Sequence, residues 1–198
     1  MAIRTAFTEL FQIDHPLVLA PMGGASGGAL AAAVSEAGGL GLVGGGYAEP
    51  GWLERELGTV ASTTDKPWGA GVITWAASED AIRLILSCRP AAVFLSFGDP
   101  APFGALVKES GTRLICQVQD VAGARRAAAA GADVIVAQGT EAGGHGSRRA
   151  AGDPDIAMVW AGEGTDLITA VEPAGNLVTQ IMAQAEDLLR GAPRQLDH

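Results

Sequence analysis

Short runs that are apolar on both faces alternate with segments patterned as helices along the first 140 residues of the chain. Such runs are typical of parallel strands covered by helices, whereas a strand exposed on one side alternates apolar with polar residues. The pattern predicts six strands, at residues 17–21, 40–44, 68–74, 91–97, 113–119 and 133–138.

Residues that start and stop helices fill the segments between the predicted strands. Ser26, Ser78 and Asp120 each stand where a helix N-cap is expected, because their side-chain oxygens can accept a hydrogen bond from a free backbone N–H group. Pro50 marks the start of another helix, and Gly131 is placed to end the helix that follows Asp120. The chain is therefore predicted to consist of consecutive strand–helix units with short connections.

Right-handed strand–helix repetition forms either an open doubly wound sheet or a (β/α)8 barrel of the TIM type. Glycine-rich loops follow almost every predicted strand, whereas a Rossmann domain would concentrate them in the first turn and place an acidic residue after the second strand. Glycines occupy that second position instead, at residues 44–46. We therefore expect an α/β fold, a TIM-type (β/α) barrel with parallel strands.

The predicted barrel is incomplete, since a closed one needs eight strands and typically about 250 residues. Residues 1–150 supply about six βα units with the cofactor and active-site loops, and residues 151–198 form a C-terminal segment. That segment contains an amphipathic helix over about residues 176–190, with apolar side chains roughly on one face at Leu177, Ile181, Leu188 and Leu189. An open sheet has bare edges, which proteins commonly cover by pairing with another chain, so we expect a homodimer or weak cofactor binding.

Composition narrows the classes of function. The 198 residues carry a net charge of −9 and give a pI near 4.7, which argues against a nucleic-acid-binding surface. Cys88 and Cys116 lie far apart in apolar runs, and we expect buried thiols in a reducing cytoplasm. The N-terminus is too polar for a signal peptide, and no apolar run reaches the roughly 18 residues of a membrane helix. We expect a cytoplasmic protein that contacts neither nucleic acid nor membrane.

The loop after the last predicted strand carries the most informative side chains. The strand delivers Gln138 at its carboxyl end, and a glycine-rich turn then presents His145 beside Gly143 and Gly144. An amide at a strand end can hydrogen-bond the edge of a planar ring, and glycines let backbone N–H groups approach a ligand closely. A histidine with few packing neighbours can act as a general base near neutral pH. Because barrels place their sites at the carboxyl ends of strands, we expect His145 to be catalytic rather than an idle loop residue.

Two motifs resemble the nitronate monooxygenase (2-nitropropane dioxygenase) family. Residues 137–146, AQGTEAGGHG, match the AQG-x-EAGGH-x-G signature of its bacterial members, and residues 16–24, PLVLAPMGG, are similar to its PI-x-x-APM-x-G pattern. The resemblance implies a barrel that binds FMN at the carboxyl ends of its strands and oxidises small nitronates or nitroalkanes with O2. It also implies that the motif histidine, His145, is the base. The cofactor contacts that it implies are Pro21, Met22, Gly23, Gly71, Gln138, Gly143 and Gly144.

The chain departs from the family pattern at two places. Residues 67–71, PWGAG, put Gly71 where family members often have an asparagine that faces the flavin. After residue 151 the sequence contains neither the GGI turn nor the GTR turn with which the family binds the FMN phosphate. Glycine in place of the asparagine bears on which substrate the site accepts, and the missing turns bear on how the FMN phosphate is bound.

Two other functions stay open. An FMN-dependent enoyl-thioester reductase shares the barrel and parts of the first-strand motif, and it needs a nicotinamide as reductant. A truncated paralogue without catalysis, acting as a binding or structural partner, would account for the absent phosphate turns. Three residues also keep two interpretations each. The Met22 side chain either lines the flavin or fills the core. Trp75 either walls the active-site pocket or packs ordinarily, and Glu141 either accepts hydrogen bonds from the loop backbone or orients His145.

Overall fold

The computed structural model describes residues 3–139, 141–143 and 163–195 of the chain. Its centre is a parallel sheet in which each strand pairs with the next one along the chain. In order, the strands are β1 Gly41–Gly44, β2 Trp68–Ile73, β3 Ala92–Ser96, β4 Arg113–Val118 and β5 Val134–Ala137. A TIM-type barrel has this sequential order and a doubly wound sheet does not, so the predicted fold class is confirmed.

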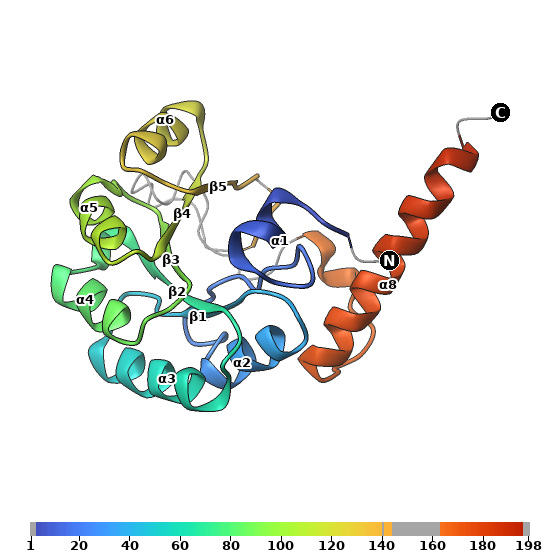
Figure 1. Cartoon of the computed structure of the whole chain (residues 1–198), viewed down its shortest axis with the longest axis horizontal. Helices are drawn as coiled ribbons and strands as arrows, with labels where there is room; N and C mark the ends of the chain where they lie inside the picture. Colours follow the sequence, from blue (N-terminus) through green and yellow to red (C-terminus); the bar gives the residue numbers. More distant parts are fainter. Residues whose placement is uncertain (1–2, 140, 144–162, 196–198) are drawn as a thin grey trace.

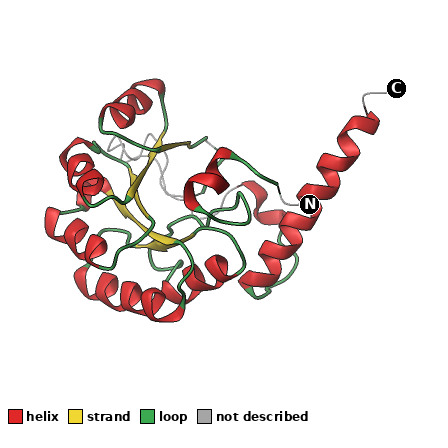
Figure 2. Cartoon of the chain, viewed as in Figure 1, coloured by secondary structure: helices red, strands yellow, loops and turns green. Residues whose placement is uncertain are grey.

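Helices follow one another along the convex side of the sheet, and one short helix lies on the concave side (Figures 1 and 2). The convex helices are α2 Gly28–Glu36, α3 Pro50–Thr63, α4 Glu79–Ser87, α5 Ala101–Glu109 and α6 Val121–Ala129. The concave helix is α1 Ala6–Phe11, and a 3-10 helix, η1 Thr74–Ala76, follows β2. The strands and helices of residues 3–139 thus form part of a barrel wall and do not by themselves close a ring.

The first predicted strand, residues 17–21, forms only a single parallel bridge, between Val18 and Leu40. The backbone N–H of Leu19 donates to the Leu40 carbonyl at 3.0 Å, which fixes this segment beside β1. The pairing does not continue to Pro21, whose nitrogen carries no hydrogen for a ladder bond. The predicted position next to β1 is confirmed, whereas the predicted length of the strand is wrong.

The sheet has a hydrophobic layer on each side. The convex layer joins strands to helices, and its fully buried members include Val43, Val72, Leu95, Leu114, Leu53, Leu57, Ile82 and Ile85. The concave layer joins the strands to α1 and the turn after it, through Leu40, Leu42, Phe94, Ile115, Phe11 and Ile13. Because α1 fills the concave face from the amino-terminal side of the strands, the carboxyl ends are left for polar side chains.

The predicted helix boundaries depend on capping, and four of them are confirmed. Ser78 accepts a backbone N–H at 3.2 Å at the start of α4, and Asp120 accepts one at 2.6 Å at the start of α6. Pro50 is the first residue of α3. Gly131 has a φ of +84° just past the end of α6, a conformation that only glycine adopts without strain. Local chemistry thus determines where these helices begin and end.

The C-terminal helix α8, Ala174–Gln195, is longer than the predicted 176–190 and packs on α2. The side chains that it buries, against Val34 of α2, are Val178 and Met182. The apolar residues that were expected to define its buried face are exposed instead, from 40% for Leu177 to 75% for Leu188. The C-terminal half of α8 extends away from the sheet (Figure 1), and the predicted domain division near residue 150 lies outside the described residues.

Candidate functional site

An amide pair marks the concave side of the sheet at its carboxyl edge. Side chains alternate along a strand, so Gln119 points to the same side as Ile115, which belongs to the concave layer. Gln138 follows β5 and has the same parity as Val136, which packs against that layer. The Gln119 Nε2 group donates to Gln138 Oε1 at 2.9 Å.

The backbone also holds Gln138 in place. Its N–H group donates to the Val118 carbonyl at 2.9 Å, so both main chain and side chain connect it to the end of β4. The expectation that the strand delivers Gln138 at its carboxyl end is therefore met in position, while its contact with a flavin stays a prediction. Gln119 was not anticipated. The available signal was a polar residue two positions beyond another, Gln117, at the end of an otherwise apolar strand.

The turn after residue 21 forms part of the rim, by which we mean the loops at the carboxyl ends of the strands. Ser26 does not cap α2, whose N-cap is Gly27, so that prediction is wrong. The Ser26 hydroxyl instead accepts the Met22 N–H at 2.7 Å and donates to the Met22 carbonyl at 3.1 Å. These bonds close a tight turn with Gly24 at a φ of +74°. The turn holds the backbone of Met22 and Gly23 at the solvent-exposed carboxyl edge, where the resemblance places the flavin ring.

Glycines let two neighbouring turns touch. A Cβ atom on Gly23 would lie 2.9 Å from the Cα of Gly46, and one on Gly44 would collide with the Met22 carbonyl oxygen. No larger residue fits at Gly44 without moving backbone, because the obstacle is itself a main-chain atom. The close approach explains the run of glycines after β1. It also brings the turn after residue 21 into contact with the turn after β1, and we call this continuous glycine-lined surface the glycine floor.

Gly71 lies under the ring of Pro21. A Cβ atom at position 71 would lie 2.6 Å from Pro21 Cβ and 3.2 Å from Phe94 Cβ, so this part of the concave face is already filled. Gly71 is buried in β2 and offers a ligand no side chain. The asparagine common in the family at this position is incompatible with Pro21 where it lies here, and contact between Gly71 and the flavin stays a prediction.

The motif loop is described only in part. Gly143 is half-buried, whereas Gly144 and His145 lie outside the described residues, so the roles predicted for all three stay predictions. The Glu141 carboxylate folds back over Gly139, where it fills the space that a Cβ atom at 139 would need. This contact lies within the loop, and the exposed Glu141 side chain is free to rotate away from residue 139.

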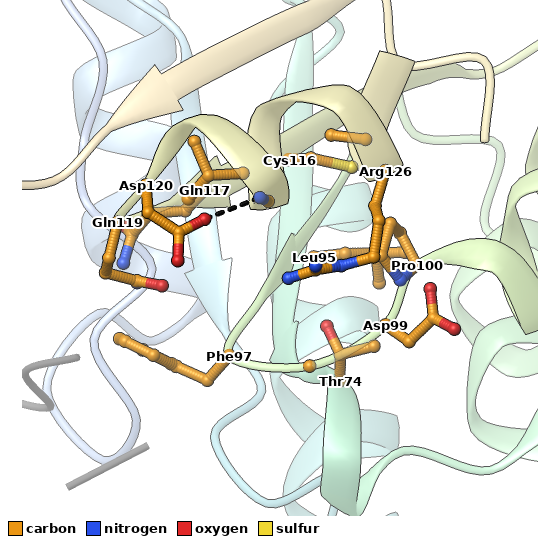
Figure 3. A pocket seen from close by; sticks show the side chains of 14 residues that line it. Thr74, Leu95, Phe97, Asp99, Pro100, Cys116, Gln117, Gln119, Asp120 and Arg126 are labelled. Carbon is orange, nitrogen blue, oxygen red and sulfur yellow. Dashed lines mark hydrogen bonds between the residues drawn. The ribbon is translucent and has the colours of Figure 1, made fainter. Parts of the chain in front are cut away.

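A cavity of about 330 Å³ opens at the same edge, between the loops that follow β3 and β4 (Figure 3). Its lining includes Thr74, Phe97, Gln119, Asp120 and Arg126. In Figure 3 the Arg126 side chain extends from α6 into the cavity beside Leu95 and Pro100, and Phe97 points to the opposite side. This cavity was not predicted from the sequence, because Asp120 was interpreted there only as a helix cap.

Both cysteines are free thiols, but the prediction that both are buried holds only for Cys116, because Cys88 is half-buried. Cys116 is buried in β4 on the convex side and lines the cavity. Burial raises the pKa of its thiol to about 11, so the thiol stays protonated at neutral pH and is a poor nucleophile. Cys116 is therefore a packing residue rather than a catalytic one.

Two aromatic rings stand exposed on the rim beside this cavity. Tyr47 follows β1 and Trp75 lies in η1, and their ring centroids are 5.6 Å apart at an interplanar angle of 59°. Tyr47 is 53% exposed and Trp75 is 59% exposed. Trp75 is thus not a core residue, and it packs against Tyr47 at the surface, so both interpretations given for it stay open.

The fit of these residues to FMN differs between the two ends of the cofactor. At the ring end, the Gln138 amide on the concave face and the exposed backbone at Met22 and Gly23 have the right chemistry to meet the polar edge of a flat ring. At the phosphate end, the sequence after residue 151 has neither family turn, and the described residues 163–195 hold only η2 Glu163–Leu167 and α8. The ring end fits, while the described part of the chain offers no phosphate turns of the family type.

Within residues 3–139, 141–143 and 163–195, no helix is both long and apolar enough to cross a membrane. The same ranges contain no cluster of three or more histidine, cysteine or acidic side chains that could hold a metal ion. In these ranges the candidate site therefore consists of the Gln119–Gln138 amide pair, the glycine-rich turns, and the exposed rings of Tyr47 and Trp75.

Solved structures match this arrangement. FabK from Thermotoga maritima has a TM-score of 0.67 and 38% sequence identity over 72% of this chain and 46% of its own. A nitroalkane oxidase from Streptomyces ansochromogenes has a TM-score of 0.61 and 30% identity over 72% of this chain and 50% of its own. Both support an incomplete TIM-type barrel as the fold.

Curated relatives cover the same part of the chain. A CoA dehydrogenase of Mycobacterium tuberculosis, named for a 5-hydroxy-7a-methyl-1-oxo-octahydroindene-4-carboxyl-CoA substrate, is 34% identical over 146 residues, covering 73% of this chain and 41% of the relative. The nitronate monooxygenase of Paraburkholderia phytofirmans is 32% identical over 192 residues, covering 77% of this chain and 52% of the relative. The chain spans about half the length, or less, of these relatives.

The family model described as nitronate monooxygenase matches residues 4–81 and 73–155, most of the chain. These residues include the first turn, the glycine floor and the motif loop. With the family match, the strand order and the two signature motifs in agreement, the chain belongs to the nitronate monooxygenase family.

Proposed function

We propose that this chain forms the substrate side of an FMN-dependent oxidoreductase site that oxidises alkyl nitronates or nitroalkanes with O2. Family membership supports the class of chemistry. The observation that carries the proposal is the placement of Gln138, which two hydrogen bonds of 2.9 Å hold at the carboxyl edge directly before the histidine motif.

The residues would divide the work as follows. Backbone groups of Pro21, Met22 and Gly23, together with the Gln138 amide, would hold the ring of the cofactor, and the motif glycines would approach it from the other side. Bound FMN supplies an acceptor for the electrons of the substrate. His145 would take the proton from the carbon next to the nitro group, or orient the nitronate already formed. The Gln119–Gln138 bond restrains the amide that faces the ring.

A thioester substrate is the second candidate, and the comparisons supply its support. The M. tuberculosis CoA dehydrogenase is 34% identical over 73% of this chain, about as similar as the Paraburkholderia nitronate monooxygenase at 32% over 77%. Gly71 in place of the family asparagine adds to this support. Both favour an enoyl-thioester reductase or a related CoA-dependent enzyme as the alternative.

Loss of catalysis is the third candidate. The absent phosphate turns favour a paralogue that binds a partner instead of turning over substrate. Retention of FMN after reconstitution, followed by turnover, would exclude this candidate. Failure to retain FMN under conditions that keep the chain folded would support it.

One experiment separates the three candidates. The purified chain is reconstituted with FMN, and flavin absorbance is followed anaerobically after addition of propyl-1-nitronate, or of NADPH followed by an enoyl-CoA. We expect the nitronate alone to bleach the flavin and O2 to restore its colour. Bleaching only after NADPH would overturn the nitronate assignment in favour of the thioester reductase.

The matched control for the base is a second histidine. His145→Ala should lower the rate of flavin reduction by neutral nitroalkane by about 100-fold or more, because a positioned base contributes that much. His198→Ala, which lies outside both signature motifs, should leave the rate unchanged. Equal rates in the two variants would remove His145 from the mechanism.

The open edge of the sheet supports a homodimer. Among the described strands β5 pairs with β4 alone, and an unpaired strand edge favours association with another chain. Light scattering coupled to size exclusion should therefore give twice the chain mass of 20.0 kDa. A monomer that binds FMN and stays monomeric at high concentration would overturn this proposal.

A further inference from the structure

We infer that Tyr47 and Trp75 form an aromatic wall that selects substrates with a ring-sized apolar group. The inference deepens the proposed function, because it assumes that the redox site lies at the carboxyl ends of the strands. The observation is the exposed pair itself, with ring centroids 5.6 Å apart and each ring more than half exposed.

Backbone hydrogen bonds anchor the two residues of the aromatic wall. The Ile73 N–H donates to the Gly46 carbonyl at 2.8 Å, so the loop that carries Tyr47 is bonded to the strand that leads to Trp75. The Trp75 N–H in turn donates to the Phe97 carbonyl at 3.3 Å, which joins η1 to the loop after β3. The backbone on which the two rings stand is therefore anchored to three adjoining strand ends.

Two exposed rings forgo the stabilisation that burial would give, and packing within the chain does not explain why they are exposed. A buried aromatic residue removes about 150–250 Å² from water, and most of that gain is lost when the ring stands on the surface. Exposed apolar groups that gather at one place commonly mark a binding site. Here they gather where barrel enzymes bind substrate, and Met22, 46% exposed, stands on the neighbouring turn.

The geometry of the pair indicates what it would bind. Two rings inclined at 59° present an angled apolar surface that a flat or fused carbocycle can contact on two sides. A propyl chain has no ring face with which to stack against either aromatic side chain. The occupant is therefore a substrate whose reacting polar end is joined to an aromatic or alicyclic ring.

Binding of unreactive analogues tests the wall apart from the chemistry. A carboxylate has the shape and charge of a nitronate, so phenylacetate and propionate serve as ring-bearing and small probes. Their affinities for the full chain, and for every variant, are measured by NMR titration through the line widths of the probe's own protons, a readout that does not depend on Trp75. We expect phenylacetate to bind about tenfold more tightly than propionate, the equivalent of roughly 1.4 kcal/mol.

Variants decide whether the aromatic pair causes the preference. Trp75→Ala should abolish it, Trp75→Phe should retain it, and Val121→Ala, which removes an exposed apolar side chain on α6, should leave it unchanged. Equal affinity for the two probes in the wild-type chain, or a preference that survives Trp75→Ala, would overturn the inference. A preference without nitronate oxidation would support the wall and contradict the proposed reaction, so the two failures are distinguishable.

Discussion

Strands β3 and β5 have similar sequences and different surroundings. Both are short and apolar, AVFLS and VIVA, and both pair in parallel register. All residues of β3 are buried between two neighbouring strands and two apolar layers, whereas β5 alternates between half-buried and exposed positions, with Ile135 41% exposed. An apolar sequence therefore predicts a strand, and burial depends on neighbours that the sequence of the strand cannot supply.

The largest expected effect is on the free energy of unfolding, when a buried side chain in the middle of the sheet is truncated and compared with a partly exposed one in β5. Leu114 of β4 is fully buried, so Leu114→Ala should lower the free energy of unfolding by about 3 kcal/mol through lost burial and a cavity. Ile135→Ala in β5 should lower it by about 1 kcal/mol, because part of that side chain is already in water. Urea unfolding of both variants measures the difference. Equal losses would mean that β5 is covered in solution, as a homodimer through this edge would do.

The glycine floor of the rim gives the next effect. Gly44→Ala would force a methyl group into the Met22 carbonyl, and we expect a loss of about 2–3 kcal/mol in stability together with a displaced first turn. Gly58→Ala is the matched control, because the same change in the middle of α3 meets no atom within 4 Å. It should stabilise the chain by about 0.5–1 kcal/mol through helix propensity. Thermal unfolding of the two variants should therefore move in opposite directions, and destabilisation by both would contradict the argument.

Local signals in the sequence were sufficient to predict most of the strands and helices around the sheet. Ser78 and Asp120 identified two helix starts because an N-cap acts over three residues, and the uninterrupted apolar runs identified five strands as parallel. Ser26 failed as a cap because its hydroxyl found two partners in the preceding turn. The buried face of α8 was assigned wrongly because Val178 and Met182 match the surface of α2, a tertiary fact.

The candidate site was predictable to a smaller extent. Gln138 was located correctly because a strand end is a local feature, but its partner Gln119 comes from the neighbouring strand and follows only from the register of β4 with β5. Pro21 over Gly71 is likewise a contact between segments 50 residues apart in the sequence. Motif resemblance located the loop, and only the packing of neighbouring loops located the aromatic wall.

A charge at the amino end of the edge strand gives a smaller effect. Asp133 precedes β5 and accepts hydrogen bonds from Lys108 Nζ at 2.9 Å and from the Leu114 N–H at 2.8 Å. Burial alone would raise the pKa of this carboxyl, but the bonds to Lys108 and Leu114 and the charges of Lys108 and Arg113 together lower it below 3.8. A depressed folded-state pKa means that the stabilisation is complete above 3.8 and is lost as the pH falls through the lower, folded-state value.

Asp133→Asn should therefore cost about 1 kcal/mol at neutral pH and progressively less as the pH falls below that of an ordinary carboxyl. The measurement is the free energy of unfolding against pH for the variant and the wild-type chain. Asp65→Asn is the control, since Asp65 is exposed and its removal should leave the curve unchanged. A constant difference between Asp133→Asn and wild type down to strongly acid pH would show that the ion pair is not its source.

The smallest effect is expected on the exposed face of α8, which completes the comparison of covered and open regions. Leu188 is 75% exposed, so Leu188→Gln should change the free energy of unfolding by less than about 0.5 kcal/mol. Leu189→Gln should behave in the same way, because that side chain is 60% exposed and lies on the part of the helix that extends from the body (Figure 1). Thermal unfolding at two protein concentrations measures both. A loss above about 2 kcal/mol that grows with concentration would mean that this helix face, rather than the β5 edge, is covered by a second copy, because only a surface buried on association links stability to protein concentration.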